Sequence, residues 1–251
     1  MDSPRISRRL KLLTYNIHSG VGRDGLCDLS RIQRVVREEQ GHEGQTFIAA
    51  LQEIEQTPLG DQVNELATGG SATASFCATR ASGEGSFGMA VLSSLQVLRT
   101  EYYDLSYGVG REPRYCQRTD LEVEPGAVLH VFNCHLGLAA RERRFQRDRM
   151  LSDAILLARD LHHPVILMGD FNDSPVSVVH SSLRRHFRDA FRAAGHLWGP
   201  TFRVGPIPLR LDYIYVSSGI RVLSCFVRKD ALARVASDHL PLLATVEVGW
   251  P

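Results

Sequence analysis

Short apolar runs and amphipathic segments alternate along the whole chain. Most of the apolar runs are bounded by turn residues such as Pro125 and Gly126, a pattern typical of β-strands. Apolar residues also recur at helical spacing after Asp28, which suits a helix N-cap, and again over residues 141–161, so both segments are predicted to be helices. We predict strands at residues 10–15, 47–51, 88–92, 97–103, 115–123, 128–134, 165–168, 211–216, 220–227 and 240–248.

The order of these elements indicates the fold class. Some strands follow one another as in hairpins, and others are separated by a helical segment. This mixture favours two packed mixed β-sheets with helices outside over a doubly wound parallel sheet. No repeat, low-complexity tract or Pro/Ser-rich linker divides the sequence. We therefore expect an α+β protein in which residues 1–251 form a single domain.

Net charge and cysteine content exclude few classes of function. Lys+Arg 29 against Asp+Glu 28 leaves a net charge of +1, which argues neither for nor against nucleic acid as a partner. No run approaches the ~18 apolar residues of a membrane helix, no secretory signal is recognisable in residues 1–9, and nothing indicates an obligate protein partner. Five scattered cysteines, odd in number, are expected to be buried free thiols of a cytoplasmic protein.

Polar residues recur at the ends of the predicted strands. Residues i and i+2 of a strand share a face, so Asp170 and Asn172 are predicted to point into one cleft, as are Asn16 and His18. Grouped at one edge of a sandwich, such side chains offer oxygen ligands to Mg²⁺ or Mn²⁺ and imidazoles for proton transfer. Zinc is not expected, because clustered Cys or His at fixed spacing is absent. The polar groups are Asn16-Ile17-His18, Gln52-Glu53, Asn133-Cys134-His135, Asp170-Phe171-Asn172, Leu211-Asp212-Tyr213 and Ser237-Asp238-His239.

These segments resemble the ordered motif series of the endonuclease/exonuclease/phosphatase superfamily, which has the DNase I-like fold. The matching segments are residues 14–20, 51–53, 133–136, 169–172, 211–213 and 237–241, and residues 112–114 resemble the family's acidic-x-Arg element. Each motif alone is weak, but six in the right order are specific. The resemblance covers residues 10–248 and is to bacterial members of unassigned substrate. It implies a four-layer α/β sandwich, in which two packed mixed β-sheets are flanked by helices.

The resemblance also implies a site for Mg²⁺ or Mn²⁺. The position of Glu53 is the family's main metal ligand, and the position of Asn16 lies close to the metal or the phosphate. Asp238 corresponds to a metal-associated carboxylate. A cation held by Glu53 would stabilise the negative charge that develops on a phosphate during hydrolysis.

The proton-transferring groups are implied in the same way. The Asp170 position orients or deprotonates the attacking water, or protonates the leaving group, and the Asn172 position holds the phosphate or the nucleophile. The Asp212 and His239 positions form a hydrogen-bonded pair whose imidazole faces the phosphate. From the residues alone, the carboxylate of Asp212 is expected to raise the pKa of His239 by favouring its charged form. The His135 position donates to the phosphate.

Two further residues are candidates for binding the substrate phosphate. Arg114 would add positive charge beside the metal. His18 stands where other members carry Asp, and it either contacts the phosphate or only hydrogen-bonds within its loop. A structural explanation also exists for Asp170 and Asn172, since Asp and Asn favour the turn that follows a buried strand.

Together these residues predict a divalent-metal-dependent hydrolase of phosphodiester or phosphomonoester bonds. A nuclease acting on DNA or RNA is favoured, because Arg111, Arg114, Arg141, Arg143 and Arg210 are close in sequence to the motifs and could follow a polyanionic backbone. The alternative substrate is a phospholipid or a small phosphodiester, although no membrane-binding amphipathic segment stands out. A binding module that has lost catalysis is the other class of function. Such a module normally lacks the metal carboxylate or the final histidine, and both are present here.

Overall fold

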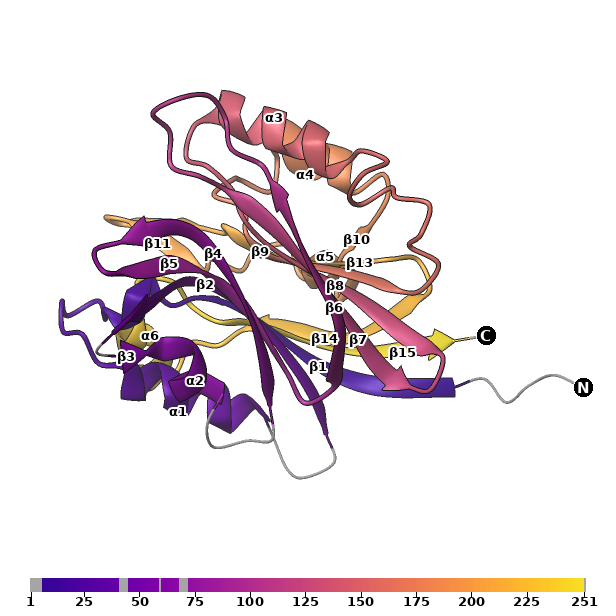
Figure 1. Cartoon of the computed structure of the whole chain (residues 1–251), viewed down its shortest axis with the longest axis horizontal. Coiled ribbons are helices and arrows are strands. Elements are labelled where there is room, and N and C mark those ends of the chain that lie inside the picture. The colour runs from indigo at the N-terminus through magenta and orange to yellow at the C-terminus, as the bar shows by residue number, and fades with distance from the viewer. Residues whose placement is uncertain (1–5, 41–44, 59, 68–71, 251) are drawn as a thin grey trace, which may run out of the picture.

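Two β-sheets pack face to face, with helices on both outer faces (Figure 1). The computed structural model describes residues 6–40, 45–58, 60–67 and 72–250. In the first sheet the strand order is β14 (Ile220–Val227), β15 (Leu242–Trp250), β1 (Ile6–Asn16), β2 (Thr46–Thr57), β5 (Gly85–Ser93) and β4 (Thr73–Ser82), and β3 (Gly60–Asp61) pairs with β2. In the second sheet the order is β10 (Arg188–Asp189), β13 (Asp212–Val216), β9 (Val165–Asp170), β8 (Ala127–His135), β7 (Tyr115–Glu124) and β6 (Gln96–Asp104).

Both sheets are mixed, as predicted. β1 runs parallel to β2 and β8 runs parallel to β9, whereas the other pairs are antiparallel. A separate hairpin is formed by β11 (Phe202–Val204) and β12 (Ile207–Leu209).

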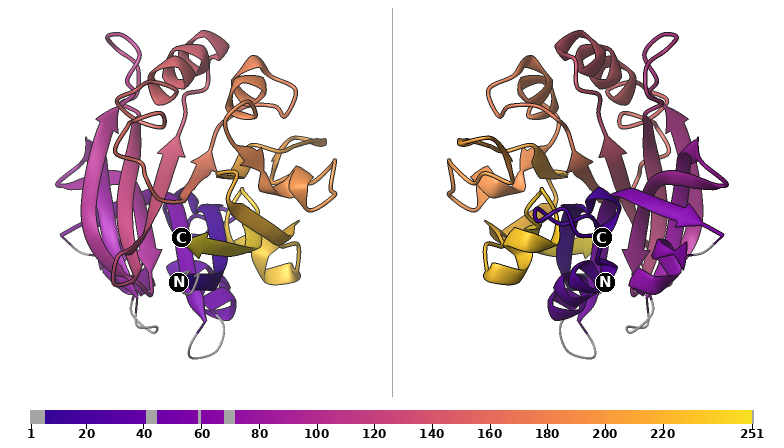
Figure 2. Two further views of the ribbon diagram at one scale, coloured as in Figure 1. Left: turned by 90° about the vertical axis from the view of Figure 1, so that its right-hand side faces the viewer. Right: turned by 90° about the vertical axis from the view of Figure 1, so that its left-hand side faces the viewer.

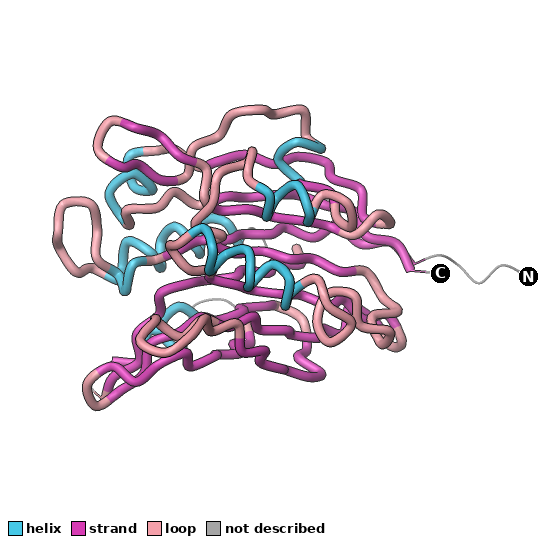
Figure 3. Tube along the Cα trace, turned by 90° about the horizontal axis from the view of Figure 1, so that it is seen from above, coloured by secondary structure: helices cyan, strands magenta, loops and turns pink. Residues whose placement is uncertain are grey.

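The helices complete four layers. α1 (Leu29–Gln40), α2 (Gln62–Ala67) and α6 (Ala231–Ala236) pack on the outer face of the first sheet. α3 (Ala140–Met150) and α4 (Val178–Leu183) cover the second sheet, as the views from the side and from above show (Figures 2 and 3). The short α5 (Ala190–Ala193) packs against β13 and β14. This is the predicted four-layer α/β sandwich.

Alternating residues of the central strands explain why both faces are covered. Leu12 lies in the core between the sheets with Ile48 and Ile166. The next residue, Leu13, points the other way and packs with Ile32 of α1. Because both faces are buried, these strands are continuous apolar runs rather than alternating ones.

Each predicted strand is present, but the prediction of one long helix over residues 141–161 is wrong. α3 ends at Met150, and residues 151–161 form turns. The hydroxyl of Ser152 donates to the carbonyl of Arg149, and the backbone N–H of Leu156 donates to the carbonyl of Met150. These bonds return Ile155 and Leu156 to the core of the second sheet, which is why the apolar spacing continues past the helix.

The cysteines agree only in part with expectation. All five are free, and four are buried, but Cys27 is exposed. Within the described residues, no helix is both long enough and apolar enough to cross a bilayer. Of the segment 1–9 considered for a secretory signal, residues 1–5 lie outside the described part of the chain.

Candidate active site

The polar motifs come together at one edge of the sandwich. β1 ends there at Asn16, and the parallel strand β2 passes the same edge at Gln52 and Glu53 before it ends at Thr57. β8 and β9 end there too, with His135 opposite Asp170, and β13 begins there with Asp212 opposite Asp170. The segment before β15 reaches the same edge, where the hydroxyl of Ser237 donates to the backbone carbonyl of Asn16 at 2.8 Å. Strand direction therefore places the motifs side by side although they are distant in sequence.

His239 lies between two buried carboxylates. Its Nδ1 is 2.8 Å from Oδ2 of Asp212, and its Nε2 is 3.6 Å from Oδ2 of Asp170. Burial alone would lower the pKa of His239, but the negative charges of Asp212 and Asp170 raise it to about 10. Burial raises the pKa of Asp170 to about 7, against the opposing effect of the His239 charge. The site thus holds a protonated imidazole beside a carboxyl group able to exchange a proton near neutrality.

Asn16 joins two carboxylates through its amide nitrogen. Nδ2 donates to Glu53 at 2.8 Å and to Asp170 at 3.1 Å. Its oxygen accepts the backbone N–H of His18, so the opposite amide orientation would bring two donors together. The side chain of Asn16 thus holds Glu53 and Asp170 next to each other. Its role as a metal ligand stays a prediction.

Glu53 is presented by an irregularity in its strand. The register between β2 and β5 shifts between Gln52 and Ile54, which makes Glu53 the extra residue of a β-bulge. Its φ of 57° lies in the left-handed region that disfavours side chains. The other non-glycine residues described with positive φ are His18, Ser19 and Asn172, all at this edge. Strain gathered at one edge of the sheets is typical of a functional site.

His135 lies close to both Asp170 and Glu53. Its Nε2 is 3.5 Å from Asp170 and 3.9 Å from Glu53. Burial, together with the nearby charges of Arg114 and His239, keeps the pKa of His135 well below its usual range, so the ring is neutral. Arg114 is buried and is paired with Glu112 at 2.6 Å, while its Nε has no hydrogen-bond partner in the described structure. Both residues therefore belong to the site, with Arg114 supplying positive charge.

Asn172 reaches the site through a turn rather than along the strand. β9 ends at Asp170, and Asn172 has a φ of 49°. Its backbone N–H donates to Oδ1 of Asp170, and its side-chain nitrogen donates to the carbonyl of Leu136. We predicted that Asp170 and Asn172 approach each other as residues on one face of a strand. That prediction is wrong, because Asn172 lies in the turn after the strand. The turn explanation and the functional one are both compatible with this geometry.

His18 and Asp238 form the outer part of the site. Nδ1 of His18 lies 3.2 Å from the carbonyl of Val21 and 3.9 Å from Asp238. The hydroxyl of Ser237 donates to Asp238 at 3.3 Å. Among the contacts described for Asp238, none joins it to Glu53 or Asp170. His18 thus contacts its own loop, one of the two alternatives predicted for it, and its contact with a phosphate and the metal role of Asp238 stay predictions.

The inner donor set suits a divalent cation. Asp170, Asp212 and His239 each place a ligand atom within 4.8 Å of the others, although His239 and Asp212 are already bonded to each other. Oδ1 of Asp212 is buried and has no hydrogen-bond partner within the described structure. Glu53 and Asp170 both accept a hydrogen bond from the same amide nitrogen, Nδ2 of Asn16. Closely spaced carboxylate oxygens with unfilled bonding capacity are what a hard cation satisfies.

Three of the five arginines considered for binding a polyanion already have other partners. Arg210 is buried, pairs with Asp189, and stacks over the ring of Tyr213 at 4.3 Å. Arg143 pairs with Asp173 at 3.2 Å, and Arg114 pairs with Glu112. Only Arg111 and Arg141 are exposed. An arginine near a motif in sequence can thus be part of the scaffold.

Two supporting residues were not identified from the sequence as part of the site. The hydroxyl of Thr201 accepts the backbone N–H groups of Leu211 and Asp212, which fixes the start of β13. The ring of Phe202 lies 4.6 Å from that of His239. The Thr-Phe pair precedes the Leu-Asp-Tyr motif in the sequence, but no local pattern indicates that the chain returns to contact it.

Comparison with known proteins gives a consistent result. The model of the Endonuclease/Exonuclease/phosphatase family matches residues 13–239. A functionally unknown conserved protein from Enterococcus faecalis V583 superposes with a TM-score of 0.76 at 26% identity, over 94% of this chain and 98% of that one. An endonuclease/exonuclease/phosphatase from Beutenbergia cavernae gives 0.78 at 23%, over 96% and 72%. The mannosyl-6-phosphatase Bt3783 of Bacteroides thetaiotaomicron gives 0.75 at 18%, over 94% and 99%. No curated protein matches the sequence.

Proposed function

Because the chain belongs to the endonuclease/exonuclease/phosphatase family, we propose that it is a divalent-metal-dependent hydrolase of phosphoester bonds in which the whole chain forms one catalytic domain. The observation that carries this proposal is the position of His239 between Asp212 and Asp170, with Glu53 joined to Asp170 through the amide of Asn16. A merely structural histidine has no need of two buried acidic neighbours, one of which keeps an unbonded oxygen.

Glu53 and Asp170 are the residues that would hold the cation. Their carboxylate oxygens are the ligands that Mg²⁺ and Mn²⁺ prefer. When bound, the cation supplies positive charge to the phosphate. Asn16 keeps the two carboxylates at a fixed separation through its amide.

The remaining side chains move protons and hold the phosphate. His239, protonated and oriented by Asp212, directs Nε2 toward the interior of the site and donates to a phosphate oxygen. Asp170, close to Nε2 of His239, orients the attacking water and accepts its proton. Neutral His135 donates a hydrogen bond, and Arg114 adds charge on that side.

The class of substrate is a narrower proposal. Nucleic acid is the class favoured by the sequence, but of its five arginines only Arg111 and Arg141 are free to meet a polyanion. Salt-sensitive binding would still be expected if these two contact phosphates.

A second candidate, an amphiphilic phosphoester such as a phospholipid, is favoured by exposed apolar side chains around the site. Among the described residues, every large apolar side chain that is more than half exposed lies in a segment that leaves or enters the sheets at the active-site edge. Exposed apolar side chains in these segments suit an apolar ligand or a lipid surface. The side chains are those of Leu26, Val109, Leu138, Val176, Val178, Leu197, Trp198, Val204 and Ile207.

One experiment separates these substrates. Plasmid DNA, single-stranded RNA and phospholipid vesicles are incubated with the protein and Mg²⁺ at low and moderate salt, and products are followed by gel and by headgroup release. Cleavage of DNA or RNA that weakens with salt supports the nuclease. Headgroup release with intact nucleic acid supports the phospholipid. If the protein cleaves none of these three substrates and does not cleave a simple chromogenic diester either, the proposed hydrolase is contradicted.

A further inference from the structure

A small cavity lies beside His239. Its volume is about 130 Å³, and Phe202, whose ring is 4.6 Å from that of His239, forms part of its wall. Asp238, the residue before His239, also lines it. The remaining lining residues are Arg23, Pro200, Thr201, Arg203, Lys229, Arg234 and Leu240.

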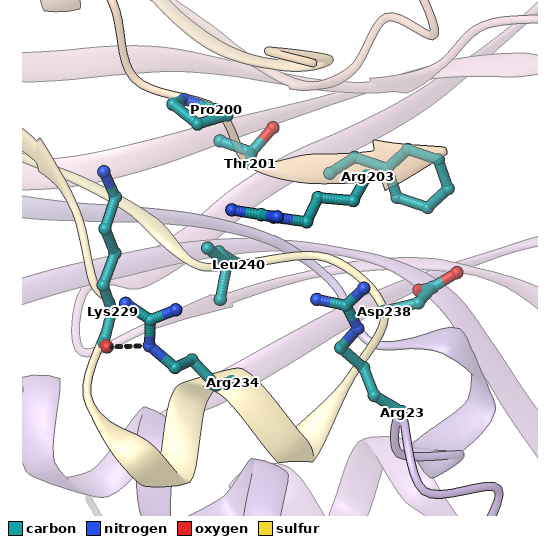
Figure 4. A pocket seen from close by; sticks show the side chains of 9 residues that line it. Arg23, Pro200, Thr201, Arg203, Lys229, Arg234, Asp238 and Leu240 are labelled. Carbon is teal, nitrogen blue, oxygen red and sulfur yellow. Dashed lines mark hydrogen bonds between the residues drawn. The ribbon is translucent and has the colours of Figure 1, made fainter. Parts of the chain in front are cut away.

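Four of these side chains are cationic and lack an acidic partner. None of the ion pairs found in the described part of the chain involves Arg23, Arg203, Lys229 or Arg234, and all four are exposed. The one hydrogen bond described between them runs from Nε of Arg234 to the backbone carbonyl of Lys229, at 2.7 Å. Figure 4 shows the Arg203 side chain crossing above Leu240, with Arg23 and Arg234 rising from below. Against a net charge of only +1 for the chain, this is a strong local concentration of positive charge.

The cavity is tied to the catalytic strands by short hydrogen bonds. The backbone N–H of Leu240 donates to the carbonyl of Thr201 at 2.6 Å. The hydroxyl of Thr201 in turn accepts the N–H of Asp212 at 3.2 Å. The backbone of Arg23 is held by the carbonyl of Val235 at 3.0 Å. The walls of the cavity are therefore built on the same backbone that positions Asp212 and His239.

Size and charge together define the ligand. The cavity is much smaller than the roughly 300–1,000 Å³ of a pocket for a drug-sized molecule, so it suits a single small group. Guanidinium groups bind phosphate through paired, charge-assisted hydrogen bonds. We propose that this cavity binds a second phosphate group of the substrate, which is not hydrolysed, next to the phosphoester that reacts. This inference rests on the proposed function. The second phosphate comes either from a neighbouring nucleotide or from a small molecule that carries two phosphates.

Binding of matched ligands tests the proposal without requiring turnover. Calorimetric titrations in EDTA compare thymidine 3′,5′-bisphosphate with thymidine 5′-monophosphate, and fructose 1,6-bisphosphate with fructose 6-phosphate. The wild-type protein is expected to bind the bisphosphate of at least one pair about tenfold more tightly or better, since a charge-assisted hydrogen bond contributes about that factor. The pair that shows the preference identifies the nucleotide or the sugar-like source.

Variants show whether the preference arises in the cavity. In the double variant Arg203→Gln with Arg234→Gln, the ratio of the two affinities should fall to within about threefold. Arg192→Gln, an exposed arginine of α5 outside the cavity, is the matched control and should keep the wild-type ratio. Equal affinity for both members of each pair, or a ratio that the double variant preserves, overturns the proposal. Turnover of bis-p-nitrophenyl phosphate with Mg²⁺ is measured on the same samples, and its absence would contradict the hydrolase while the affinity ratio still decides on the cavity.

Discussion

Nδ1 of His239 lies 2.8 Å from Oδ2 of Asp212, and both side chains are buried. This contact leaves Nε2 of the ring directed toward Asp170, at 3.6 Å. The carboxylate of Asp212 therefore fixes both the orientation and the charge of the His239 imidazole, which faces Asp170. The two residues are expected to act as a unit, so their loss should not be additive.

A double-mutant cycle tests this coupling. Asp212→Asn and His239→Ala should each lower kcat by at least about 10²-fold. Asp212→Asn removes the carboxylate that orients the imidazole of His239, and His239→Ala removes the imidazole itself. The double variant should lose far less than the product of the two factors. Strictly multiplicative losses would contradict a coupled pair. The pKa of His239, followed by NMR in metal-free protein, should fall from about 10 toward its ordinary value near 6.5 in Asp212→Asn.

Removing the charge of Glu53 should affect cation binding more than folding. Glu53 is partly exposed at a bulge of β2 and contributes little to the core, so Glu53→Gln should change the free energy of unfolding by less than about 1 kcal/mol. Its affinity for Mn²⁺, measured by calorimetry, should fall at least about tenfold. Glu38→Gln, at an exposed glutamate near the C-terminal end of α1, is the control. Unchanged Mn²⁺ affinity in Glu53→Gln would remove Glu53 from the metal site.

His180 should make the protein less stable as the pH falls. Burial, helped by the charge of Arg210, lowers the pKa of His180 to about 3, and its Nδ1 lies 2.6 Å from the hydroxyl of Tyr215. The unfolded chain takes up this proton near pH 6.5. Stability is therefore fully present above pH 6.5 and is lost as the pH falls from there toward 3.

Urea unfolding at pH 7, 5.5 and 4 measures this contribution. Between pH 7 and pH 4, His180→Gln should lose less stability than the wild type, by up to about 3 kcal/mol. His186→Gln, at an exposed histidine, should follow the wild-type curve. If the His180→Gln and wild-type curves are parallel, His180 does not cause the acid sensitivity.

The sequence was sufficient to predict ten of the strands and the edge at which the motifs meet, but not β4 or the short strands β3, β10, β11 and β12. Asn16, Asp170 and Asp212 all lie where predicted strands begin or end, and strand direction then brings them together. The pairing of His239 with Asp212 was implied by the family resemblance, and the structure has that hydrogen bond. Short continuous apolar runs carried this information, because the central strands are buried on both faces.

The pattern of apolar and polar residues could not predict local backbone conformation or contacts between residues distant in the sequence. The bulge that presents Glu53 depends on its register with β5, and the orientation of Asn16 depends on the N–H of His18. Arg210 is held by Asp189, a partner that no local spacing indicates. The basic cavity likewise draws on segments near residues 23, 203 and 234, which only the folded chain brings together.

The central claim is tested most directly by the turnover of bis-p-nitrophenyl phosphate in the presence and absence of a cation. Wild-type protein and His239→Ala are assayed after exhaustive treatment with EDTA and again after addition of Mg²⁺ or Mn²⁺. We expect no turnover by the chelated wild type, restoration by either cation, and a rate at least about 10²-fold lower in His239→Ala. Full turnover by the chelated protein, or an undiminished rate in His239→Ala, would contradict the account.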